Sequence, residues 1–286
     1  MSFRIVTDSS ANISALPGVN FGSVPLKIVA AKEYVDDENL DVAGMVADLL
    51  NHKGKSSSSC PNVADWLEAF GDAQYIFAIT ITKHLSGSYN SAWQAAQMYS
   101  QEHPDRKVFV LDSLSTGPAM MMLVDKILEW EKAGMDFEAT KQAALDYANH
   151  THTLFCLKSM MNLARNGRTN IAVARIAGLL DIRVAGAVEG GKIVPLCKPR
   201  GEKKAIAALV NLIRERGFRD GNILRIAHCF AEDTAQTLIK TVQAEFPNAR
   251  VHLEPTGGLC SFYAEKCGMI ISFEGDFNEK NDNRKF

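Results

Sequence analysis

The sequence predicts an α/β protein with two domains, an N-terminal parallel sheet covered by helices and a C-terminal α+β domain with a mainly antiparallel sheet. In the first half, short β-rich runs alternate with helical patterns, which is typical of a parallel sheet. In the second half, strands follow one another with few helices between them. A chain of 286 residues also favours two cores over one. We expect domains at 1–150 and 151–275, and a polar tail at 276–286.

The first domain is expected to hold four strands, each bounded by polar or turn-forming residues, at 3–7, 24–30, 75–80 and 107–111. Apolar residues recur at i, i+3, i+4 and i+7 from Val63 to Phe70 and again from Tyr89 to Ala96, which predicts two amphipathic helices. Two longer helices, at about 119–134 and 137–149, are rich in helix-forming residues and close the domain.

The second domain is expected to hold strands at 154–157, 183–188, 192–196, 223–228 and 251–254, and helices at about 203–216 and 231–245. Gly190 and Gly191 lie between two of these apolar runs, and their freedom to adopt positive φ predicts a tight hairpin turn. After Phe273 the apolar pattern stops, and we expect a frayed tail.

Composition excludes several classes of protein. A net charge of −2 with scattered Lys and Arg residues argues against nucleic acid as a partner. Apolar runs such as 76–81 and 269–272 are too short for a membrane span, and the N-terminus lacks the pattern of a signal peptide. The six cysteines form no CxxC pair, so we expect free thiols, no metal site, no cofactor and a cytoplasmic location.

Hydroxyl-bearing segments follow three of the predicted strands. Because the strand-to-helix junctions of a parallel sheet gather at its carboxyl edge, these segments predict an anion-binding edge, where helix N-termini add partial positive charge. The alternative is that the hydroxyls only cap helices. The segments are Asp8-Ser9-Ser10, Ser86-Gly87-Ser88 and Asp112-Ser113 with Ser115-Thr116-Gly117, and a further polar turn is expected at 56–62.

Six ordered motifs along nearly the whole chain resemble those of the DegV family. They are IVTDSSANI, the Ser-rich turn before Pro61, ITITKHLSGSYNSA, VLDSLSTG, LARNGR and LLDIRVAGAVEGGKIVPLCKPRGEKKA. The resemblance implies a bacterial, two-domain protein of the EDD fold with a lipid tunnel between the domains. It further implies that the protein binds a long-chain fatty acid, such as palmitate or oleate, without reacting with it, and presents it to a fatty acid kinase.

The resemblance also assigns residues. Ser58 takes the place of a carboxylate-binding Thr in the family's TSQPS turn, and Ser86 with the Gly87 backbone forms the second clamp. Arg168 and Arg200 match arginines near the head-group opening, where they contact the head group or the partner. For the assembly, we expect a monomer or a weak dimer.

Two segments depart from the family pattern. The turn that reads HTGPG in the family corresponds to residues 263–268, where no His is present, and the TSQPS turn keeps only its first hydroxyl and its proline. These departures favour lipid binding over delivery to a kinase, and they leave another small anion open as the ligand.

Three other classes of function remain open from the residues alone. Ser86 lies in a strand-turn-helix context, but the GxSxG elbow of a serine hydrolase is missing. Asp8 and Asp112 at strand ends could hold Mg²⁺ for a phosphate-containing ligand, although neither GxxxxGK[ST] nor GxGxxG is present. An interaction module without a ligand is the third class.

Overall fold

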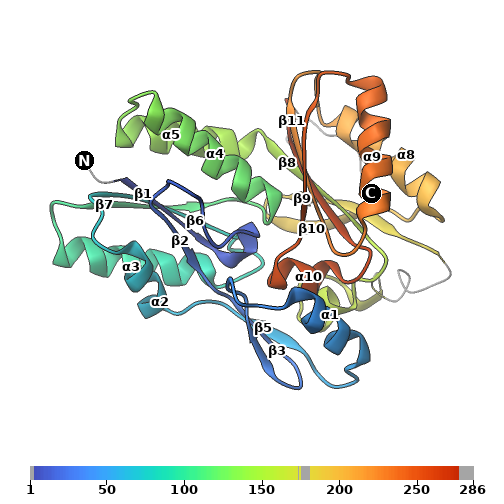
Figure 1. The fold of residues 1–286 in the computed structure, drawn as a ribbon, viewed down its shortest axis with the longest axis horizontal. Coiled ribbons are helices and arrows are strands. Elements are labelled where there is room, and N and C mark those ends of the chain that lie inside the picture. The colour runs from blue at the N-terminus through green and yellow to red at the C-terminus, as the bar shows by residue number, and fades with distance from the viewer. Residues whose placement is uncertain (1–2, 173, 175–180, 277–286) are drawn as a thin grey trace.

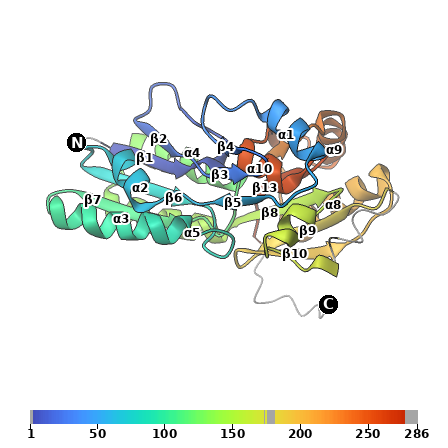
Figure 2. The same cartoon turned by 90° about the horizontal axis from the view of Figure 1, so that it is seen from below.

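The computed structural model describes residues 3–172, 174 and 181–276. Two sheets lie side by side along the long axis of the molecule, one built from the first half of the chain and one from the second (Figures 1 and 2). The predicted fold class is confirmed, because the first sheet is entirely parallel and the second is antiparallel except at one pair.

The N-terminal sheet has the strand order β2-β1-β6-β7. Its strands are β1 (Phe3–Asp8), β2 (Phe21–Val24), β6 (Tyr75–Thr80) and β7 (Lys107–Asp112). Figure 1 shows two helices on each side of it: α2 (Val63–Phe70) and α3 (Ser88–Glu102) below, and α4 (Pro118–Lys132) and α5 (Phe137–Asn149) above. Two apolar cores fill the space between the sheet and these two layers. Three of the four predicted helices are confirmed to within two residues at each end, and the one predicted from Tyr89 to Ala96 continues to Glu102.

The strand expected at 24–30 is wrong as one element. The chain leaves the first sheet at Val24 and enters a different, three-stranded sheet at Lys27. Pro25 separates the two strands, and a proline, which has no N–H to donate, disfavours a continuous strand there. Leu26 then donates its backbone N–H to Ser9 Oγ at 3.0 Å, outside any sheet ladder.

The three-stranded sheet has the order β4-β3-β5, with β3 at Lys27–Val29, β4 at Glu33–Val35 and β5 at Ser57–Ser59. The polar turn expected at 56–62 is therefore wrong in its first half, since Ser57–Ser59 forms a strand antiparallel to β3. The backbone of these serines pairs with β3, and the pattern of side chains in the sequence does not indicate such backbone pairing. Helix α2 follows after a capping box between Asn62 and Asp65.

The C-terminal sheet has the order β10-β9-β8-β13-β11-β12. Its strands are β8 (Thr151–Leu157), β9 (Val184–Glu189), β10 (Lys192–Cys197), β11 (Ile223–His228), β12 (Arg250–Pro255) and β13 (Met269–Glu274). The hairpin between β9 and β10 turns at Gly190 and Gly191 with φ of +52° and +78°, as predicted. β13, which the sequence marked only as a short apolar run, lies in the middle of the sheet between β8 and β11.

Helices α8 (Glu202–Glu215) and α9 (Glu232–Glu245) cover the outer face of this sheet. Three helices that the sequence did not indicate, α1 (Val42–Asn51), α6 (Met161–Arg165) and α10 (Gly258–Ala264), pack near the inner face with the three-stranded sheet. Within this core, Ile28 and Met45 from the first half of the chain join Phe155 and Phe262 from the second. The tail at 277–286 lies outside the described residues.

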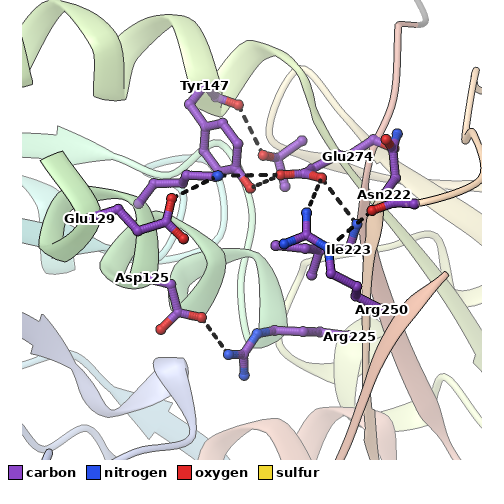
Figure 3. Close-up of polar contacts among 11 residues, drawn as sticks. Asp125, Glu129, Tyr147, Asn222, Ile223, Arg225, Arg250 and Glu274 are labelled. Atoms are coloured by element: carbon purple, nitrogen blue, oxygen red, sulfur yellow. Dashed lines mark hydrogen bonds and ion pairs between the residues drawn. The ribbon is translucent and has the colours of Figure 1, made fainter. Parts of the chain in front are cut away.

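Charged side chains join α4 and α5 to the inner face of the C-terminal sheet (Figure 3). Arg225 on β11 is nearly buried and forms an ion pair with Asp125 on α4, while its second nitrogen lies 3.5 Å from Glu254 on β12. Glu274 accepts hydrogen bonds from the Tyr147 hydroxyl and the Ile223 N–H, both at 3.0 Å. These contacts hold the two sheets in a defined relation to each other.

Candidate functional site

A cavity lies between the carboxyl edge of the N-terminal sheet and the inner face of the C-terminal sheet. Most of the wall is apolar. The lining residues are Ile81, Leu85, Thr116, Thr153, Phe155, Leu157, Leu163, Arg168, Val188, Ile193, Leu259, Cys260, Tyr263, Ala264 and Ile270.

The alternation of side chains along β8 explains why one strand serves both a core and a cavity. Phe155 and Leu157 point into the cavity, whereas Leu154 and Cys156 point to the opposite face and pack under α8 and α9. Gly186 on β9 pairs with Phe155, and a Cβ at this glycine would lie 2.4 Å from the phenyl ring. The Phe155 ring can therefore occupy this position in the cavity wall only because Gly186 has no side chain.

Polar groups gather at one end of the cavity, around Tyr263 on α10. The Ser58 Oγ on β5 lies 2.6 Å from the Tyr263 hydroxyl. The Arg168 guanidinium lies over the Tyr263 ring, 5.9 Å from its centre, and Arg168 Nε donates to the Leu85 carbonyl at 3.0 Å. Burial raises the pKa of the Tyr263 phenol, so the hydroxyl stays protonated and can donate a hydrogen bond.

The Ser86–Gly87 loop lies at the same end. Leu85, the residue before it, lines the cavity, and a Cβ at Gly87 would lie 3.0 Å from the sulfur of Cys60. Cys60 directly follows β5, so the loop and the serine strand are neighbours. The structure thus places Arg168 in the cavity wall, Ser58 beside the lining residue Tyr263, and Ser86 and Gly87 directly after the lining residue Leu85.

Helix capping does not account for the hydroxyls of Ser115 and Thr116. The N-cap residue of α3, Gly87, has no side chain, and Ser86 Oγ accepts the N–H of Ser88, the first residue of that helix, at 3.2 Å. Ser115 Oγ donates to Thr153 Oγ1 at 2.6 Å, across to the other sheet, rather than to the start of α4. The capping alternative is therefore wrong for Ser115 and for Thr116, whose hydroxyl contacts Cys260.

Asp8, at the end of β1, is fully buried and holds the loops of this edge together. Its carboxylate accepts from the N–H and the hydroxyl of Ser10, from the Ile81 N–H at 2.9 Å and from the Ser88 hydroxyl at 2.6 Å. Burial raises the pKa of Asp8, and these hydrogen bonds oppose that shift. Both carboxylate oxygens are engaged with protein donors. Within the described ranges, no group of three His, Cys, Asp or Glu residues is placed to hold a metal ion.

Arg200 is the one assigned residue that is not part of this cluster. It forms an isolated bridge with Ile182, its side chain is exposed, and it is not among the described residues that line the cavity. Conversely, the sequence did not single out Tyr263 as a ligand. The Phe262-Tyr263 pair inside a short apolar helix was the available signal, because a buried tyrosine needs a partner for its hydroxyl.

Comparison with known proteins identifies relatives over nearly the full length. A family model described as "Uncharacterised protein, DegV family" matches residues 2–274. A DegV domain-containing protein of Streptococcus pneumoniae is 39% identical over 282 residues, which are 96% of this chain and all of that protein.

Several solved structures are also similar to this chain over nearly its full length. A DegV family protein from Eubacterium eligens loaded with heptadecanoic acid superposes with a TM-score of 0.93 at 39% identity, covering 96% of this chain and 100% of that one. The Streptococcus pneumoniae Fatty Acid Kinase (Fak) B3 protein loaded with linoleic acid gives the same TM-score and coverage at 38% identity. In the described part of this chain, no helix is long and apolar enough to cross a membrane.

Proposed function

The chain belongs to the DegV family, and from this premise we propose that it binds one long-chain fatty acid in the cavity between its two sheets. The carboxylate is held at the end formed by Ser58, Ser86 and the Gly87 backbone, and Arg168 supplies positive charge nearby. The observation that carries the proposal is a mostly apolar cavity whose lining residue Tyr263 lies under Arg168 and contacts the Ser58 hydroxyl.

The apolar tail and the carboxylate of such a ligand contribute differently to the free energy of binding. A chain of about fifteen methylenes at ~0.8 kcal/mol each offers on the order of 12 kcal/mol before the cost of association. Hydrogen bonds to a carboxylate are charge-assisted, but they replace bonds to water, so they add less net free energy. The tail therefore supplies most of the affinity, and the polar end sets the direction in which the ligand enters.

The same proposal makes the protein a carrier and not a catalyst. The Ser86 hydroxyl accepts a hydrogen bond from the backbone of its own turn, and the GxSxG elbow is absent. We propose that the carrier presents the carboxylate to a fatty acid kinase in the cytoplasm, with the exposed Arg200 as a contact for that partner. In this arrangement residues 1–150 and 151–275 act as the two domains that enclose the ligand.

Mass spectrometry of an organic-solvent extract of the purified protein tests the proposal. We expect a fatty acid in near-stoichiometric amount, or uptake of added palmitate or oleate if the protein is purified empty. An empty extract together with no binding of either acid would overturn it. Stabilisation by Mg²⁺ and ATP instead would favour a phosphate-containing ligand, and labelling by a fluorophosphonate would favour a hydrolase.

Serine variants on β5 test the placement of the carboxylate. Ser58→Ala is expected to weaken binding of the acid but not of the corresponding long-chain alcohol, because only the carboxylate needs a charge-assisted donor. Ser57→Ala is the matched control, since the neighbouring side chain is exposed and lies on the other face of the strand. Equal effects of the two substitutions would contradict the placement.

A further inference from the structure

The cavity wall carries a second polar patch, separate from Ser58 and Arg168. It consists of Thr116, in the loop after β7, Thr153 on β8 and Cys260 on α10, all of which line the cavity. Thr116 and Cys260 contact each other, and Ser115, the neighbour of Thr116, bonds to Thr153. Thr116 and Cys260 are thus in direct contact, and Thr153 is linked to this pair through Ser115.

Two members of this patch are already engaged with the protein. Thr153 Oγ1 accepts from Ser115 Oγ at 2.6 Å and lies 2.8 Å from Ser272 Oγ, so its hydrogen-bonding capacity is largely used. The Cys260 thiol donates to the Ser10 carbonyl, with 3.4 Å between sulfur and oxygen. Neither group needs a ligand atom to complete its bonds.

Thr116 differs from both. Within the described residues, its hydroxyl contacts only the Cys260 sulfur, at 3.8 Å, and sulfur is a weak acceptor. The side chain is partly buried and faces the cavity. A hydroxyl in an apolar enclosure without a strong partner is unfavourable, and a polar atom on a bound ligand would relieve that cost.

We propose that Thr116 is a specificity residue that lets the cavity accept an acyl chain bearing a hydroxyl or other oxygen substituent within the chain. This inference rests on the proposed function, because it concerns the tail of the ligand whose carboxylate lies at Ser58. An oxygen atom on the chain loses its hydration on entry, and the surrounding apolar wall does not replace it. An oxygen atom that lies opposite Thr116 regains a hydrogen bond from the Thr116 hydroxyl. The affinity for a substituted acyl chain therefore depends on the position of the substituent along the chain.

The test compares stearate with a panel of monohydroxystearates that differ in the position of the hydroxyl. Affinities are measured by displacement of a fluorescent fatty acid from the full-length protein. In the unmodified protein, we expect one position or two adjacent positions to bind at least about three- to tenfold better than the other hydroxystearates, which is the effect of one net hydrogen bond. Uniformly weak binding of every hydroxystearate would overturn the inference, even if Thr116→Val did not fold.

Two substitutions at Thr116 assign the effect to its hydroxyl. Thr116→Val keeps the shape of the side chain and should abolish the positional preference among the hydroxystearates. Thr116→Ser keeps the hydroxyl and should retain the preference. A preference that survives in Thr116→Val would overturn the assignment, and failure of the unmodified protein to bind stearate at all would instead reject the proposed function.

Discussion

The hydroxyl groups of Ser58 and Tyr263 lie 2.6 Å apart, although the two residues are separated by 205 positions in the sequence. Ser58 belongs to a short strand of three serines, and Tyr263 belongs to a helix that packs against the C-terminal sheet. The contact therefore closes one end of the cavity with one group from each half of the chain. Arg168 lies over the same tyrosine ring, which adds a cation to this end.

Tyr263→Phe removes the phenol while keeping the ring beneath Arg168. We expect fatty-acid affinity to fall about three- to tenfold, since one net hydrogen bond at the polar end is lost. Displacement of a fluorescent fatty acid measures the change. A double-mutant cycle with Ser58→Ala should show that the two substitutions are not additive, because both remove the same contact. Fully additive effects would mean that the two hydroxyls act independently.

The hairpin between β9 and β10 gives a second prediction. A Cβ at Gly191 would lie 2.3 Å from Oγ1 of Thr82, which follows β6 of the N-terminal sheet, whereas a Cβ at Gly190 would meet nothing within 4 Å. Both glycines have positive φ, so alanine is strained at each. Gly191→Ala should therefore destabilise the protein by about 1–3 kcal/mol more than Gly190→Ala, through the steric conflict alone.

Chemical denaturation of the two alanine variants measures this difference. Gly191→Ala should also weaken fatty-acid binding, because Val188 and Ile193 on either side of the hairpin line the cavity. Gly190→Ala is the matched control for the backbone strain. Equal stabilities would show that the hairpin shifts to relieve the clash with Thr82 at no cost in stability, and that its contact with the N-terminal sheet does not stabilise the protein.

Local sequence patterns were sufficient to predict the helices and strands that bury one regular apolar face. The strand at 75–80 and the helix at 137–149 agree with the structure to the residue, because the apolar pattern and the turn residues around them indicate the same ends. The carboxyl-edge placement of Ser86 and Gly87 also followed from the parallel sheet.

Local sequence patterns could not predict the contacts between the two halves of the chain. Ser57–Ser59 has no apolar periodicity, and it forms a strand only because the exposed edge of β3 offers backbone partners. β13 lies in the middle of the sheet between strands that are distant in sequence, so its short apolar run did not reveal its place. Tyr263 was missed for the same reason, since its partner Ser58 comes from the other half.

The ion pair between Arg225 and Asp125 supplies a third prediction (Figure 3). Asp125→Asn leaves the nearly buried Arg225 with Glu254 alone, at 3.5 Å. We expect a loss of about 1–3 kcal/mol in the free energy of unfolding, less than for a fully buried pair because Asp125 is partly exposed. Asp276→Asn breaks the exposed pair with Arg219 and should change stability much less, because solvent screens an exposed pair. Similar losses in both variants would show that burial of Arg225 is unimportant.

His152 on β8 makes the stability of the protein depend on pH. Its ring is buried and lies 3.2 Å from the Gly275 carbonyl oxygen, and burial lowers its pKa from 6.5 to about 4. Between these two values the unfolded chain binds the proton and the folded chain does not, so folding is favoured above pH 6.5 and this contribution is lost as the pH falls. Asp8 acts in the opposite direction, because burial raises its pKa, and only a comparison with a variant isolates the histidine.

His152→Gln replaces the titrating ring with a neutral side chain that can still donate to the Gly275 carbonyl. Between pH 7.5 and 5, the free energy of unfolding of the unmodified protein should fall by about 2 kcal/mol more than that of the variant. Urea denaturation at a series of pH values measures both curves. The difference between the two curves should change between pH 6.5 and about 4, where the unfolded chain of the unmodified protein binds the proton and the folded chain does not. Parallel curves would show that His152 has the same pKa in the folded and unfolded states.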